Sequence, residues 1–132
     1  MSVLSDIQKV IDWYSQEYSG AGIETLMDCK SRLLTLCARF AEEVADSKRG
    51  SVMATVFRKA DFHNMKSRMI DEGFTIGLAE SKSTQAVKAQ MTQEAESEAL
   101  FFKSKLLLDI SLKIAEDITQ RISILKKERE NA

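Results

Sequence analysis

Apolar positions in the first half of the chain recur every three or four residues, which is the period of an amphipathic helix. One stripe covers residues 5–18, a seven-residue pattern covers residues 23–47, and a less regular stripe covers residues 52–72. Glycines fall between these stripes, at 19–22, 48–51 and 73–77, so we expect the chain to break there. The pattern therefore predicts three helices, the first capped by Ser5 and Gln8 in a capping box.

The end of the chain reads as one long helix that runs to about residue 130 and is capped by Ser81 or Ser83. Its second half carries two overlapping apolar lines, and one neighbouring helix would cover only one of them. We therefore expect this helix to pack both on its own chain and on a second copy. The residues predicted to form the homo-oligomer interface are Leu107, Leu108, Ile110, Ile114, Ile118, Ile122 and Leu125.

The fold class predicted from these patterns is all-α. The chain has no proline, which would break helix interiors, and no strand-type alternation. Its 132 residues suit a single domain. We expect an elongated helical bundle of about four helices, with an N-terminal helical hairpin (1–47), a basic helix and glycine-containing loop (48–82), and a long oligomerising helix (83–132).

Charge is distributed unevenly along the chain. Residues 1–47 hold 4 basic and 8 acidic side chains, residues 48–88 hold 8 and 4, and residues 89–132 hold 7 and 8. The middle third, with net charge +4, interleaves cations with aromatic rings, and cations bind phosphates while rings stack on unpaired bases. A solvated helix face with phenylalanines in the core would give the same pattern. The candidate nucleic-acid-binding residues are Arg58, Lys59, Phe62, His63, Lys66, Arg68 and Phe74.

The residues needed for catalysis or metal binding are largely missing. His63 is the only histidine, the glycines form no phosphate-binding loop, and there is no spaced set of cysteines and histidines. On one helix Cys29 and Cys37 would lie roughly 12 Å apart, too far for a disulfide, so we expect reduced thiols and a reducing compartment. We expect no enzyme activity, catalytic residue, metal or cofactor.

With no membrane-length apolar window and no signal peptide, the expected location is the cytoplasm, without a membrane partner.

Two segments resemble the small helical recombination mediators of tailed phages, the UvsY type. Leu106 to Ile110, Ala115 to Ile118, Arg121 and Ile124 to Lys127 are similar to that family's oligomerising helix. Arg58 to His63 is similar to its basic-aromatic segment, although Phe62 and His63 replace a tyrosine pair. The resemblance implies an oligomer that binds single-stranded DNA, a phage recombinase and a single-strand-binding protein, in the host cytoplasm if the chain is phage-encoded.

A second interpretation of the sequence involves no nucleic acid. A small helical adaptor, or a phage-encoded inhibitor of a host system, would use its helical surface to bind another protein. The two interpretations differ in their response to salt, because binding to phosphates weakens steeply as salt rises whereas docking of apolar helix faces responds less.

Overall fold

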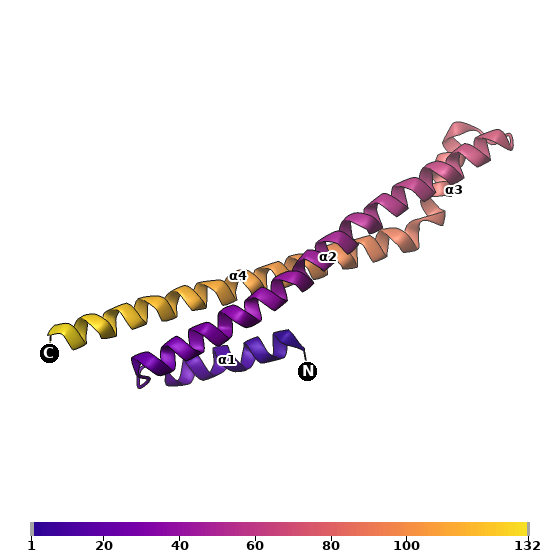
Figure 1. Cartoon of the computed structure of the whole chain (residues 1–132). Helices are drawn as coiled ribbons and strands as arrows, with labels where there is room; N and C mark the ends of the chain where they lie inside the picture. Colours follow the sequence, from indigo (N-terminus) through magenta and orange to yellow (C-terminus); the bar gives the residue numbers. More distant parts are fainter. Residues whose placement is uncertain (1, 132) are drawn as a thin grey trace. The chain divides into compact units, whose positions relative to one another are not determined.

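The computed structural model describes residues 2–131, and all four of its regular elements are helices (Figure 1). They are α1 (Val3–Glu17), α2 (Ile23–Asp71), α3 (Ile76–Ala86) and α4 (Lys88–Asn131). The described residues contain no strand, which confirms the predicted all-α class with a long last helix. Within the same residues, no helix combines the length and the apolar character that crossing a membrane would require.

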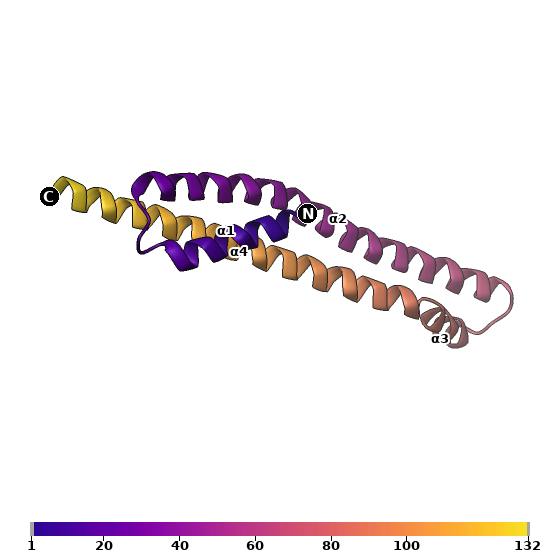
Figure 2. The same cartoon turned by 90° about the horizontal axis from the view of Figure 1, so that it is seen from below.

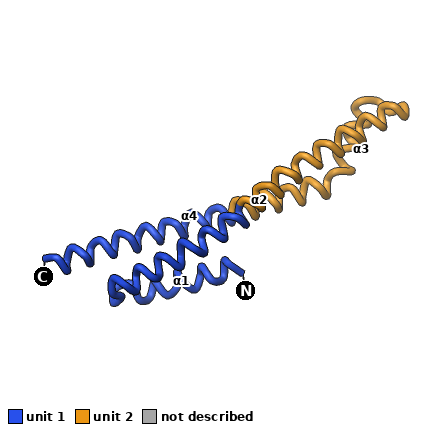
Figure 3. Tube along the Cα trace, in the orientation of Figure 1, with its two compact units in different colours: residues 1–44, 104–132 blue, residues 45–103 orange. Residues whose placement is uncertain are grey.

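The chain forms two compact units (Figure 3). Unit 1 comprises Met1–Val44 and Ser104–Ala132, and unit 2 comprises Ala45–Lys103. Helices α2 and α4 each contribute one part to unit 1 and the other part to unit 2.

The predicted break at residues 48–51 is wrong, because the 49-residue helix α2 runs through these positions without interruption. A glycine in a helix interior costs only about 1 kcal/mol relative to alanine, and packing can offset that cost. Packing is present on both sides of Gly50. The Lys48 ammonium lies 4.8 Å from the centre of the Phe101 ring, and the Thr55 hydroxyl donates a 2.8 Å hydrogen bond to the Glu94 carboxylate of α4.

Helix α1 begins earlier than the sequence pattern predicted. Ser2, rather than Ser5, is the cap, and its hydroxyl accepts a hydrogen bond of 3.1 Å from the Ser5 backbone N–H. The pattern placed the cap one turn late because both positions are serine, and a serine oxygen can bond the N–H three residues ahead at either one.

The glycine-containing stretch between α2 and α4 holds a helix that the sequence pattern missed. The chain leaves α2 at Gly73, where the backbone N–H groups of Gly73 and Phe74 donate to the Ile70 and Met69 carbonyls. This paired bonding closes the helix in a Schellman motif. Thr75 then caps α3, so Ser81 and Ser83 lie inside α3 rather than at the start of the last helix, which begins at Lys88.

We predict opposite effects for the same substitution at two glycines. Gly73 has φ +100°, so Gly73→Ala should destabilise the protein by about 1 kcal/mol. Gly50 is helical and a Cβ there would meet no atom within 4 Å, so Gly50→Ala should stabilise it by about 0.4–1 kcal/mol. Urea titrations followed by circular dichroism would measure both. Equal effects of the two substitutions would contradict the assignment of the chain break to Gly73.

In unit 1, apolar side chains fill the seam between α2 and α4. Buried positions alternate at spacings of three and four along both helices, which is the heptad spacing of a coiled coil. Helix α1 runs alongside this pair (Figure 2). It is anchored by Tyr14, whose hydroxyl donates a 2.6 Å hydrogen bond to the Asp117 carboxylate. The buried apolar residues of this unit are Ile7, Val10, Tyr14, Leu26, Cys29, Leu33, Leu36, Cys37, Phe40, Val44, Ala115, Ile118 and Ile122.

In unit 2, the same heptad positions are largely polar. Ser51, Arg58 and Asp61 occupy the α2 side, and Gln90 and Glu94 face them from α4. Four large apolar residues in this part of α2 are instead exposed. These are Val52, Met53, Val56 and Phe57. Phe62, Met65 and Met69, further along the helix, are only half-buried, so unit 2 buries less apolar surface than unit 1.

Candidate nucleic-acid interface

Four of the candidate nucleic-acid-binding residues lie on one face of α2. Lys59, Phe62, His63 and Lys66 have the spacing i, i+3, i+4, i+7, which aligns side chains along a helix surface. Lys59 and His63 are exposed, while Phe62 and Lys66 are half-buried. The Phe62 and His63 rings contact each other edge to face, with centroids 5.5 Å apart. We call these four residues the basic stripe.

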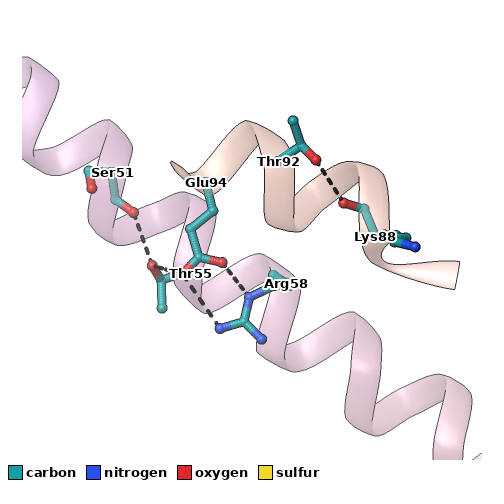
Figure 4. Close-up of polar contacts among 6 residues, drawn as sticks. All are labelled: Ser51, Thr55, Arg58, Lys88, Thr92 and Glu94. Atoms are coloured by element: carbon teal, nitrogen blue, oxygen red, sulfur yellow. Dashed lines mark hydrogen bonds and ion pairs between the residues drawn. The ribbon is translucent and has the colours of Figure 1, made fainter. Parts of the chain in front are cut away.

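Arg58, by contrast, lies in the seam of unit 2 and faces Glu94 (Figure 4). Its guanidinium Nε donates to one Glu94 carboxylate oxygen, and the Thr55 hydroxyl donates a 2.8 Å bond to the other. The hydrogen bond from Arg58, followed by that from Thr55, lowers the pKa of Glu94 below its usual value. Arg58 thus has an anionic partner within the chain, and it holds α2 and α4 together.

The remaining candidates lie away from the basic stripe. Arg68 is exposed in the last turn of α2. Phe74 follows the end of α2 and is half-buried, with the Lys82 ammonium 4.6 Å from its ring centre. Lys66 is the one member of the basic stripe with an ion-pair contact, at 4.0 Å from the Glu80 carboxylate.

Folding reduces the charge excess that the middle third of the sequence suggested. The start of α4 brings Glu94, Glu96 and Glu98 into unit 2. Residues 45–103 contain 9 basic and 8 acidic side chains, so the unit has net charge +1 rather than the +4 of residues 48–88. Any attraction for nucleic acid must therefore come from the local arrangement on α2 rather than from the charge of the whole unit.

The predicted interface residues of the last helix divide into buried, half-buried and exposed positions. Ile118 and Ile122 are buried in the core of unit 1, at 0 % and 8 % exposure. Leu107, Leu108, Ile114 and Leu125 are half-buried, and only Ile110 is exposed, at 43 %. Leu106, one turn before Ile110, is 59 % exposed and was not predicted as an interface residue.

Other reactive groups are engaged in packing. Cys29 and Cys37 are both buried free thiols, and burial raises the pKa of each. Burial, reinforced by the hydrogen bond to Asp117, also raises the pKa of the Tyr14 hydroxyl. No group of three or more histidine, cysteine or acidic side chains in residues 2–131 is placed to hold a metal ion.

Sequence reasoning missed the polar network of unit 2. It comprises the contacts of Glu94 with Arg58 and Thr55, together with a 2.7 Å hydrogen bond from the Gln90 amide to Asp61. The spacing of residues along α4 gives no partner for Glu94, because Arg58 and Thr55 lie on another helix. The signal that could have found the pairing is the heptad register shared by α2 and α4, which places Arg58 opposite the start of α4 in an antiparallel hairpin.

The function of the basic stripe has to be inferred from the chain's own residues, because the comparison with known proteins adds no relative. No protein-family model matches the chain, no curated protein matches it, and no solved structure matches it.

Proposed function

We propose that this chain is an oligomeric protein that binds single-stranded DNA through the basic stripe and acts as a recombination mediator. The observation that supports it is the alignment of Lys59, His63 and Lys66 on one helix face, with the Phe62 ring among them. Two ammonium groups can contact successive phosphates, and an aromatic ring beside them gives an unpaired base a surface on which to stack. In this proposal the protein loads a strand-exchange recombinase, works with a single-strand-binding protein, and is cytoplasmic.

Assembly belongs to the same proposal. One chain offers few cationic contacts, and a pair of lysines gives weak binding on its own. Several copies would align several basic stripes, and binding of the first would raise the effective concentration of the others. The exposed pair Leu106 and Ile110 on α4 is the surface that we propose for contact between copies, because both residues lie on the outer side of the helix that the sequence had singled out.

The test is the affinity for a labelled single-stranded oligonucleotide, measured by fluorescence anisotropy at two salt concentrations. Lys59→Ala with Lys66→Ala should weaken binding about tenfold and should flatten the slope of log affinity against log salt by about 0.7 for each lost phosphate contact. Phe62→Ala should cost about 1–3 kcal/mol of binding free energy if the ring stacks on a base. Duplex DNA of the same sequence should bind more weakly.

The matched control removes two exposed lysines from another part of the chain, as Lys105→Ala with Lys113→Ala. It changes net charge by the same amount and should leave affinity and salt slope nearly unchanged. If the variant of the basic stripe keeps wild-type affinity and salt slope while its circular dichroism is intact, DNA binding by this face of α2 is excluded.

A protein-binding adaptor is the second candidate, and the exposed apolar residues of unit 2 favour it. Val52, Met53, Val56 and Phe57, on neighbouring turns of α2, are between 41 % and 59 % exposed. Large apolar residues clustered on an exposed helix face are typical of a docking site. Under this proposal Phe57→Lys, at the most exposed of the four residues, abolishes binding of the partner protein, whereas Lys66→Ala, more than two turns further along α2, has no effect on it.

A further inference from the structure

Along one flank of the helix pair in unit 1 runs a groove that no helix of residues 2–131 occupies. Residues Met27 and Leu34 of α2 and Ile122 of α4 supply apolar side chains, and two lysines, Lys30 and Lys126, flank them. Met27 and Leu34, which lie side by side on α2 at i and i+7, are 50 % and 40 % exposed in this groove. The complete lining is Met27, Lys30, Ser31, Leu34, Thr119, Ile122, Ser123 and Lys126, and we call it the open groove.

The opposite flank of the same helix pair shows what kind of element fits. Around α2, Met27 and Leu34 lie on one side of the seam residue Leu33, while the buried Cys29 and Leu36 lie on the other. That other side receives α1, through Tyr14 and its bond to Asp117. Helix α1 therefore covers one flank of the helix pair, and the open groove lies on the other.

Helix α1 is itself an acidic amphipathic helix. Its 15 residues contain Asp6, Asp12 and Glu17 against the single cation Lys9, a net charge of −2. It inserts Ile7, Val10 and Tyr14 at spacings i, i+3 and i+7. This is the usual pattern by which a helix fills a groove between two others.

Charge indicates that the open groove suits a helix of the same type. Its lining contains two lysines and no acidic residue. Neither Lys30 nor Lys126 has an ion-pair partner among residues 2–131. Acidic side chains on the edges of an incoming helix would neutralise both lysines while its apolar side chains cover Met27 and Leu34.

We propose that the open groove docks an acidic amphipathic helix of another protein. The helix presents two turns of apolar side chains at i, i+3 or i+4, and i+7 to Met27, Leu34 and Ile122, with carboxylates against Lys30 and Lys126. This proposal does not depend on DNA binding, because the groove lies in unit 1 and the basic stripe lies in unit 2.

The experiment uses the full chain and two labelled peptide probes with the 15-residue length of α1. Both have leucine at the i, i+3, i+7 positions, with glutamate at the flanking positions in one probe and lysine in the other. Fluorescence anisotropy should show the glutamate probe binding at least tenfold more tightly than the lysine probe. Leu34→Asp should weaken it at least tenfold, and the exposure of Leu34 means that the fold should tolerate the change.

Charge reversal at the groove gives the sharper test. Lys126→Glu with Ser123→Glu should reverse the preference, so that the lysine probe binds more tightly. Lys113→Glu with Gln120→Glu makes the same change in net charge at exposed positions outside the lining and should leave the preference intact.

Three results would overturn the proposal. The first is equal binding of the two probes. The second is binding of the glutamate probe that neither Leu34→Asp nor the charge reversal affects, because such a probe would be displacing α1 instead of entering the open groove. The third is a wild-type dimer that the glutamate probe dissociates, which would identify α1 of a second copy as the occupant. Because none of these measurements contains DNA, their failure is distinguishable from failure of the proposed function.

Discussion

Ile118→Ala should lower the free energy of unfolding of unit 1 by about 2–5 kcal/mol, the range for removing a fully buried isoleucine side chain. Ile118 is 0 % exposed and lies in the seam where α4 faces α2 and α1. Shortening it to alanine leaves a cavity that the surrounding helices can fill only in part. Trp13 is the only tryptophan and belongs to α1, so its fluorescence in a urea titration reports on unit 1 directly.

Ile124→Ala is the matched control for this prediction. It is the same substitution on the same helix six residues away, but Ile124 is 49 % exposed. Its effect on unfolding should stay within about 0.5 kcal/mol, as for most surface substitutions. If the two alanine variants lose the same stability, the orientation of α4 in unit 1 is incorrect.

The sequence predicts helix type and apolar faces well, because both depend on local spacing. The stripe from Leu26 to Val44 is found buried in α2, and the first helix buries Ile7 and Tyr14 as its spacing indicated. Helix ends were predicted less well. Gly50 was taken as a break because its local cost is real, but packing along a 49-residue helix exceeds that cost.

The candidate sites depend on contacts between segments distant in sequence, which spacing alone does not reveal. The sequence near Arg58 suggests a free cation, whereas the structure places Glu94, 36 residues later, opposite it. The sequence pattern predicted Ile118 as a contact to a second copy, whereas the helices of unit 1 bury it. The open groove was not predicted, because it becomes visible only when α1 is found on one flank of the helix pair.

These placements change how self-assembly should be tested. Substituting aspartate at Ile118 would place a charge in the core of unit 1 and unfold it, so a loss of mass would say nothing about an interface. The informative positions are those on α4 that are apolar and exposed. Leu106 and Ile110 meet both conditions and lie one turn apart, so they can contact the same partner surface.

Leu106→Lys with Ile110→Lys should therefore weaken self-association at least tenfold while leaving the helical content unchanged. Burying a leucine or isoleucine side chain contributes about 1.5–3 kcal/mol, and tenfold in affinity corresponds to about 1.4 kcal/mol, so two such residues suffice for the effect. Light scattering at micromolar concentration should give a multiple of 14.9 kDa for the wild type and a shift toward 14.9 kDa for the variant. Glu116→Lys makes the same change in net charge at an exposed polar position of α4 outside the open groove and should keep the wild-type mass. A wild-type protein that is monomeric at these concentrations would contradict assembly. An oligomer that survives the Leu106 and Ile110 substitutions would place the interface elsewhere. The exposed apolar residues around Val56 would then be the next surface to substitute.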